Sequence, residues 1–336
     1  MLALAVTLAF SLLVILAAAE LFTDSLEHLG ERLRISEGVT GSLFAAIGTA
    51  LPETLVPLLA LISGTSDPNV NEEIGVGAIL GAPLMLSTLT AFLLFVAVLR
   101  ERGFQGHLKP EVTGFKRELN FFIAAFVVSA AAMYIPHSRM LIRGALSAIL
   151  IDIYLLYVLQ TVRASRELVS TGYATKAERK MLLSRIGLPL NMPVIIIQLA
   201  VALVLLLCGA KGFIYGVEGV APLLGISALL LSLLIIPVAT ELPEKMNSII
   251  WVRREKDTLG IGNITGAMVF QGTLLPALGI LLTPWIPRTE VLTGIVVTLI
   301  AALWLRINAT AKGVPVWALI FNGVLYATYL FVSFQH

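Results

Sequence analysis

Charged residues are scarce in this sequence, and cysteine is almost absent. Asp, Glu, Lys and Arg make up 13% of the 336 residues, about half of their usual share in a soluble domain. Hydrophobic residues make up 58%, and the mean hydropathy is +0.93. This composition excludes a water-soluble globular protein and indicates an integral membrane protein. The single cysteine, Cys208, excludes an intramolecular disulfide and a metal site built from cysteines.

Catalytic motifs are absent as well. The sequence contains no His-Glu-x-x-His, Gly-x-Ser-x-Gly or Walker pattern, and no residue pair that indicates a nucleophile with its base. We therefore expect no enzyme activity and no organic cofactor. The net charge of +2 is small, and basic residues gather on cytoplasmic loops of membrane proteins, so a nucleic-acid partner is not indicated.

Long apolar runs dominate the sequence instead. Each is long enough to cross a hydrocarbon core of roughly 30 Å. The runs are continuous rather than alternating, and backbone groups in lipid must bond within their own segment, so helices are expected rather than a barrel. The predicted fold class is all-α. Ten transmembrane helices are predicted, within residues 2–22, 38–63, 74–99, 119–136, 141–162, 188–210, 223–250, 259–283, 290–306 and 315–334.

The basic residues predict the orientation of these helices. With the N-terminus outside, eighteen Lys and Arg residues lie in loops on the cytoplasmic side and four on the other side. The positive-inside rule therefore predicts that both termini lie outside the cytoplasm, and we expect the cell (plasma) membrane. A basic cytoplasmic linker, 164–187, separates a first five-helix half, 1–163, from a second, 188–336.

Three segments of the first half recur in the second half at nearly constant spacing. The offset is 191 residues for two segments and 185 for the third. The pairs are Leu33–Ser36 with Leu224–Ser227, Gly48–Glu53 with Ala239–Glu244, and Gly75–Ala82 with Gly260–Ala267. Each half has five crossings, an odd number, so the second copy enters the membrane from the opposite side. Such inverted repeats are typical of secondary transporters, whose substrate site lies where the repeats meet.

Two glutamates, Glu53 and Glu244, occupy equivalent places in the repeats. A carboxylate at the centre of a membrane helix costs about 2.5–3.5 kcal/mol on insertion scales, so it needs a partner, a cation or a proton. A pseudo-two-fold axis would bring the pair together at the centre of the protein, where two carboxylates neutralise one divalent cation. The alternative is a structural polar residue near the end of a span.

Each glutamate follows a proline, Pro52 or Pro243. Proline lacks an N–H and collides with the preceding turn, so it favours a helix break just upstream and frees backbone carbonyls. These carbonyls and the hydroxyls of Thr49 and Thr240 are potential oxygen ligands. The repeated glycines of the third and eighth helices are expected to allow close packing against the broken helices; they are Gly75, Gly77, Gly81, Gly260, Gly262 and Gly266.

Two Thr-x-Leu-Pro-Glu segments, each followed by a glycine-rich helix, resemble the α-repeats of the cation/calcium antiporter superfamily, which contains sodium/calcium and proton/calcium exchangers. The resemblance implies that Glu53 and Glu244 bind calcium, and that Thr49, Thr240 and nearby carbonyls bind the exchanged ion. It implies a secondary active antiporter that exchanges calcium, or another divalent cation, for protons or sodium. Alternating access would arise as the first and sixth helices glide over the core. The expected partners are the lipid bilayer and inorganic cations.

This sequence departs from the family pattern at several positions. The usual serine before Leu-Pro-Glu is Ala50 in the first half and Glu241 in the second. The family pattern has an amide or a carboxylate at one further position. In this sequence that position holds Leu86 in the first half and Gln271 in the second, and Gln271 is a candidate ligand. Several expected sodium ligands are therefore missing, which weighs against a stoichiometry of three sodium ions.

Glu241 and Lys245 are spaced i,i+4, in the favourable order for a helical ion pair. One interpretation is an internal salt bridge that balances the added charge. The other is that Lys245 acts as a tethered cation that competes for Glu241 or Glu244 and replaces a coupling ion. In both cases the core keeps two uncompensated carboxylates, which suits one divalent cation exchanged for protons or for two monovalent cations. Glu241 is counted among the candidate cation-binding residues, and Lys245 is a candidate modulator.

Three further polar residues lie inside predicted helices. Asn263 and Thr265 would face the second motif or form interhelical hydrogen bonds. Asp152, in the fifth helix, is expected to be a buried carboxylate that either pairs helices or conducts protons. Other functions compatible with the pattern are a cation channel, a divergent transporter of another cation, and a cation-binding membrane protein that does not transport.

Overall fold

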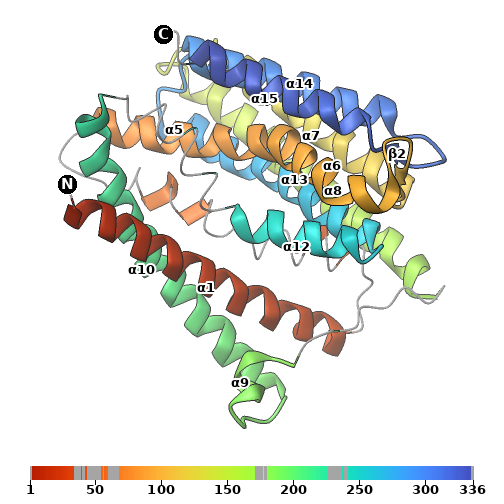
Figure 1. The fold of residues 1–336 in the computed structure, drawn as a ribbon. Helices are drawn as coiled ribbons and strands as arrows, with labels where there is room; N and C mark the ends of the chain where they lie inside the picture. The colour runs from red at the N-terminus through yellow and green to blue at the C-terminus, as the bar shows by residue number, and fades with distance from the viewer. Residues whose placement is uncertain are drawn as a thin grey trace.

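The computed structural model describes residues 2–33, 39, 42–43, 54–55, 57–59, 68–170, 177, 180–225, 233, 237 and 241–333 (Figure 1). It is mainly α-helical, in agreement with the predicted class. The helices are α1 (Leu2–Leu33), α5 (Pro68–Met85), the π-helix η2 (Leu86–Thr90), α6 (Ala91–Arg102), α7 (Val112–Ala132), α8 (Met140–Ser170), α9 (Leu182–Arg185), α10 (Met192–Leu224), α12 (Leu242–Arg253), α13 (Asp257–Leu282), α14 (Thr289–Asn308) and α15 (Ala318–Ser333). Two short strands, β1 (His107–Leu108) and β2 (Val314–Pro315), pair antiparallel.

Six of the described helical stretches are long and apolar enough to cross a membrane. They are Ala3–Phe22, Asn71–Arg102, Met140–Ala164, Met192–Phe213, Asp257–Leu282 and Thr289–Asn308. Helix α15 is apolar but shorter, and α7 has three charged residues, Lys116, Arg117 and Glu118, within its first two turns. The predicted window 38–63 lies largely, and the window 223–250 partly, outside the described residues, so ten spans remain a prediction.

Helices α1 and α10 lie side by side at one edge of the molecule (Figure 1). Four glycines of α10 lie close to residues of α1: Gly209 to Ile15, Gly212 to Ser11, Gly216 to Leu8 and Gly219 to Leu4. Residue numbers rise along α10 as they fall along α1, so the two helices are antiparallel. Such small residues allow helix backbones to approach closely in lipid. The helices end at Leu33 and Leu224, the residues that the 191-residue offset pairs.

Helix α13 forms the centre of the core. Most of its side chains from Asp257 to Ile280 are buried, and α5, α7, α8 and α12 pack around it. Tyr154 of α8 meets Phe270 edge to face, with 5.7 Å between ring centroids. A helix that is apolar on all sides is expected to be buried on all sides, which accounts for this position.

Polar contacts fix both ends of α13. At its start, Asp257 accepts from Arg102 Nη1 and Nη2 at 2.6 and 2.7 Å and from the Lys109 N–H at 2.6 Å. At its end, the fully buried Arg143 donates to the carbonyls of Ile280 and Pro284, at 2.9 and 2.7 Å. A cation suits the negative end of the helix dipole, and the donors satisfy carbonyls that the helix leaves unbonded.

The repeated glycines bring α5 and α13 against the segments that lead to the Leu-Pro-Glu motifs. A Cβ on Gly81 of α5 would lie 2.5 Å from the carbonyl oxygen of Leu233, and a Cβ on Gly266 of α13 would overlap the carbonyl oxygen of Ser42. The 185-residue offset pairs the two glycines, and the 191-residue offset pairs Ser42 with Leu233. The same contact therefore occurs twice, with the two halves exchanging roles.

Two more glycines agree with the expected close packing. A Cβ on Gly260 would lie 2.8 Å from the carbonyl oxygen of Ser248 on α12, and one on Gly262 would lie 2.9 Å from Ser42 Oγ. Close packing is thus confirmed at Gly81, Gly260, Gly262 and Gly266.

We expect Gly266→Ala to destabilise the protein, because the added methyl group overlaps backbone rather than a movable side chain. Overpacking of this kind costs about 1–3 kcal/mol, so the midpoint of thermal unfolding in detergent should fall. Gly144→Ala in α8 is the matched control, since a Cβ there meets nothing within 4 Å and alanine favours a helix over glycine. Equal stability of the two variants would contradict the close contact.

Candidate cation-binding site

The predicted ligands are only partly within the described structure. Glu53, Thr49 and Thr240 lie outside the described residues, so their positions stay predictions. Glu244 lies in the first turn of α12, next to Pro243. Glu241 adopts a turn, and α12 begins at Leu242, in agreement with a helix start at the proline, where a missing N–H removes no intrahelical bond. Among the described residues, no group of three or more His, Cys, Asp or Glu side chains could hold a metal ion.

The predicted ion pair at the second motif is present and buried. Lys245 Nζ lies 3.3 Å from Glu241 Oε2, and the two side chains are 5% and 0% exposed. The ammonium group also donates to the carbonyl of Pro237 at 3.3 Å and lies 3.6 Å from the Met85 sulfur on α5. Lys245 therefore neutralises the carboxylate that stands at the family's serine position.

Gln271 is fully buried on α13, and neither its amide oxygen nor its amide nitrogen has a hydrogen-bond partner among the described residues. A buried polar group left unsatisfied costs about 1–3 kcal/mol. A bound ion or water would satisfy this amide, which agrees with the candidate role of Gln271.

The equivalent region of the first half has a different chemistry. Leu86 opens the π-helix η2, which the sequence does not predict. Asn322 of α15 donates to the carbonyl of Ser87 in this turn at 2.7 Å, and to that of Ala301 at 3.3 Å. Pro83, which cannot donate a backbone hydrogen bond, lies in the preceding turn and is the one sequence signal for an irregular helix here. The two halves are therefore asymmetric at this position.

Two polar residues of α13 point to different neighbours. Asn263 Nδ2 donates to Ser248 Oγ on α12 at 3.0 Å, so Asn263 faces the second motif helix, as expected. The Thr265 hydroxyl instead contacts Glu118 of α7 and the carbonyl of Ile261. The expectation that Thr265 faces the second motif is therefore wrong, and interhelical hydrogen bonding, the alternative, is confirmed.

Asp152 is exposed on the surface of α8. The prediction of a buried carboxylate is therefore wrong. Its helix is apolar on nearly all sides, so the sequence carries no periodic signal for which face turns inward.

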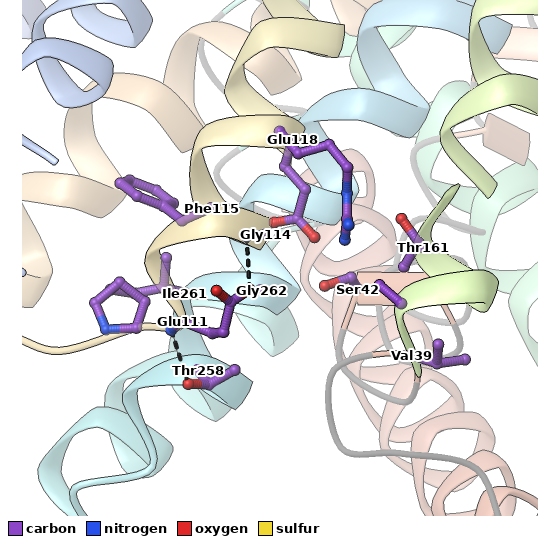
Figure 2. Close-up of a pocket in the computed structure, with 13 residues that line it drawn as sticks. Val39, Ser42, Glu111, Gly114, Phe115, Glu118, Thr161, Thr258, Ile261 and Gly262 are labelled. Atoms are coloured by element: carbon purple, nitrogen blue, oxygen red, sulfur yellow. Dashed lines mark hydrogen bonds between the residues drawn. The ribbon is translucent and has the colours of Figure 1, made fainter. Parts of the chain in front are cut away.

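Glu118 is a buried carboxylate of α7 that the predicted span does not include, because that span begins one residue later. Its side chain is 3% exposed and lines a cavity with Ser42, Thr161 and Gly262 (Figure 2). The run of charges Lys116, Arg117 and Glu118 is typical of a loop, and only the helix period distinguishes the inward glutamate from its neighbours.

The chain matches a known protein family and resembles known proteins in sequence and in fold. The family model described as sodium/calcium exchanger protein matches residues 3–162 and 194–335. The inner membrane protein YrbG of Escherichia coli (strain K12) is 27% identical over 275 residues, which cover 81% of this chain and 78% of that protein.

Two solved exchangers share the fold. The structure of the H⁺/Ca²⁺ exchanger CAX superposes with a TM-score of 0.74 at 16% identity, covering 99% of this chain and 87% of that one. The sodium-calcium exchanger NCX_Mj superposes with a TM-score of 0.65 at 17% identity, covering 98% of each chain.

We expect Lys245→Met to destabilise the protein strongly, because it leaves the buried Glu241 charge without its ammonium partner. Breaking a buried pair costs about 3–5 kcal/mol, and Glu241→Gln should restore most of the loss in the double variant. Thermal unfolding in detergent measures both effects.

The exposed pair Arg253 and Glu101 provides the control. Its side chains are 59% and 43% exposed, with 3.2 Å between Nη2 and Oε1, and exposed pairs contribute about 0–1 kcal/mol. Arg253→Met should therefore have little effect. A Lys245→Met variant as stable as Arg253→Met would contradict the buried ion pair.

Proposed function

Because the chain belongs to the sodium/calcium exchanger protein family, we propose that it is a secondary antiporter that exchanges calcium, or another divalent cation, for protons or sodium by alternating access. Membership makes it an integral membrane exchanger of cations rather than an enzyme. The identity of the coupling ion, the ion ligands and the orientation belong to the proposal. We place the protein in the cell membrane with both termini outside the cytoplasm, on the strength of its basic loops.

The reciprocal contact of Gly81 with Leu233 and of Gly266 with Ser42 carries this proposal. It supports two inverted five-helix repeats, since each glycine-rich helix packs on the motif segment of the other half. Glu53 follows Ser42 by eleven residues, and Glu244 follows Leu233 by the same number. The contact therefore supports a pseudo-two-fold arrangement in which both glutamates approach the centre.

In this arrangement Glu53 and Glu244 bind the divalent ion. Thr49, Thr240 and the carbonyls freed before the prolines complete its oxygen shell, as hard cations prefer. Gln271 contributes its amide oxygen, and its buried, unsatisfied amide supports this role.

The charges of the core favour exchange of one divalent cation for two positive charges. The Glu241 and Lys245 pair is neutral, so two carboxylates remain to be balanced. Leu86 is apolar, and Asn322 already bonds the Ser87 carbonyl behind it, so the first half offers fewer oxygen ligands for sodium. Lys245 takes the place of one coupling cation in the charge balance of the second motif.

Alternating access is proposed to use α1 and α10. The two helices pack along each other through the α10 glycines and lie at the edge of the core (Figure 1). A pair joined so closely is suited to move as one unit across the face of the remaining helices.

We expect the purified protein in liposomes to take up calcium under an imposed proton gradient or an imposed sodium gradient. Uptake driven by protons would identify the coupling ion as H⁺, and uptake driven by sodium would show that the altered residues still form a sodium site. An absence of calcium flux under both gradients, with a folded protein, would contradict the calcium assignment.

Glu53→Gln and Glu244→Gln should each reduce this uptake at least about tenfold, because even the supporting residues of metal sites contribute 10- to 100-fold to affinity. Glu101→Gln, which changes an exposed carboxylate, is the matched control and should leave uptake unchanged. Normal uptake in either motif variant would contradict the assigned ligands.

A further inference from the structure

Glu118 lies outside the proposed divalent site and joins three separate parts of the chain. The Thr265 hydroxyl of α13 donates to Glu118 Oε2. The Tyr157 hydroxyl of α8 lies 3.5 Å from Glu118 Oε1 and donates to the carbonyl of Ser42 at 3.1 Å. The carboxylate is thus surrounded by hydroxyl groups, at the junction of α7, α8, α13 and residues 42–43.

In the part of the chain that the structure describes, the charged groups around Glu118 do not neutralise it through an ion pair. Arg117 and Glu111 approach from its own helix and line the same cavity. The Glu111 carboxylate accepts the backbone N–H groups of Thr113 and Gly114 at 2.8 and 2.6 Å, as the cap of α7. From α8 the titratable group is Tyr157, and α13 contributes the hydroxyl of Thr265, which does not titrate. Among the described residues, Glu118 forms no salt bridge with Lys or Arg.

A carboxylate in these surroundings is suited to reversible protonation. A buried anion without a paired cation is costly, and taking up a proton removes the charge. Hydroxyl groups rotate, so they donate to the carboxylate and can accept from the carboxylic acid. Thr265 and Tyr157 can therefore serve both protonation states without a change of fold.

The cavity has room for water beside the Glu118 carboxylate. It has a volume of about 40 Å³ and polar side chains in its wall, and a site of this size with polar partners can hold a water molecule. Figure 2 shows the Glu118 carboxylate pointing into the space between α7 and Ser42. The cavity lies beside Pro110 and Glu111, at the end of α7 that the basic loop residues assign to the cytoplasmic side.

Glu118 also lies beside the contact between Gly266 of α13 and Ser42 of the first motif segment. Ser42 is the residue against which Gly266 packs, and Thr265 is the neighbour of Gly266 in the chain. A change of charge at Glu118 would therefore occur beside the contact between Ser42 and α13.

We propose that Glu118 is a proton-binding site, reached from the cytoplasmic side through this cavity, that sets how exchange depends on cytoplasmic pH. A proton moves reversibly from water to the carboxylate, and no other bond forms or breaks. The regulatory part rests on the proposed exchange activity, whereas proton binding itself does not.

Infrared difference spectroscopy of the purified protein tests proton binding without transport. Acidification should produce the carbonyl band of a protonated carboxylic acid in the wild type, and Glu118→Gln should lose part of that band. Glu101→Gln, the exposed control, should retain the band of the buried acid. An unchanged band in a folded Glu118→Gln variant would overturn the proposal.

Calcium flux in liposomes at varied pH on the cytoplasmic side tests the regulation. Glu118→Gln imitates the protonated acid, so its flux profile should lack the pH-dependent step that Glu118 contributes, whichever ion drives the exchange. Thr265→Val removes a donor to the anion, so the midpoint of the pH profile should move to higher pH. A wild-type pH profile in both folded variants would overturn the regulatory role.

The two kinds of measurement separate this inference from the proposed function. If the infrared band depends on Glu118 but the wild type moves no calcium, the proton site stands and the calcium assignment fails. If calcium exchange is present and neither measurement responds to Glu118, the exchange stands and the proton site fails.

Discussion

The close approach of a helix backbone to a facing carbonyl, at Gly81 and at Gly266, is the contact on which the rest of this structure depends. No side chain larger than hydrogen fits at either place. The segments leading to the two motifs therefore lie directly on α5 and α13. Other polar contacts of the core, such as those from Asn263 to Ser248 and from Tyr157 to Ser42, lie within reach of these joints. Polar side chains of the core therefore lie near the places where the helix backbones approach each other most closely.

The second constraint is charge. An unbalanced charge in a membrane interior is energetically costly. The buried charged side chains of the described structure are stabilised by ion pairs, by backbone carbonyls or by hydroxyl groups. Arg102 and Asp257 pair at one end of α13, and Arg143 caps carbonyls at the other end. Lys245 neutralises Glu241 beside the second motif. Glu118 is contacted by the hydroxyl groups of Thr265 and Tyr157, which is the basis of its proposed reversible protonation.

Much of this organisation follows from the sequence. Continuous apolar runs predict the helices, because lipid leaves the backbone no other hydrogen-bond partners. The i,i+4 spacing predicts the pair of Glu241 and Lys245, and the repeated glycines predict close packing at Gly81 and Gly266. These features depend on local spacing or on repetition, which a sequence displays directly.

Other features depend on which face of a helix turns inward, and the sequence does not display this for helices that are apolar all round. Asp152 was expected to be buried and is exposed, whereas Glu118 lies just before the predicted span 119–136 and is buried. The π-helix at Leu86 and the carbonyl-bonding role of Arg143 arise from contacts with distant helices. Only the packed structure decides these positions.

The central claim is that the two motifs meet at one ion, and cadmium binding tests it most directly. Glu53→Cys and Glu244→Cys would be combined in a Cys208→Ser background, since Cys208 is the single native thiol and is exposed. The account predicts one Cd²⁺ per chain, bound by both thiolates with the charge-transfer absorption of two sulfur ligands, and far more tightly than by either single variant. Two weak, independent cadmium sites, or no gain over the single variants, would contradict it.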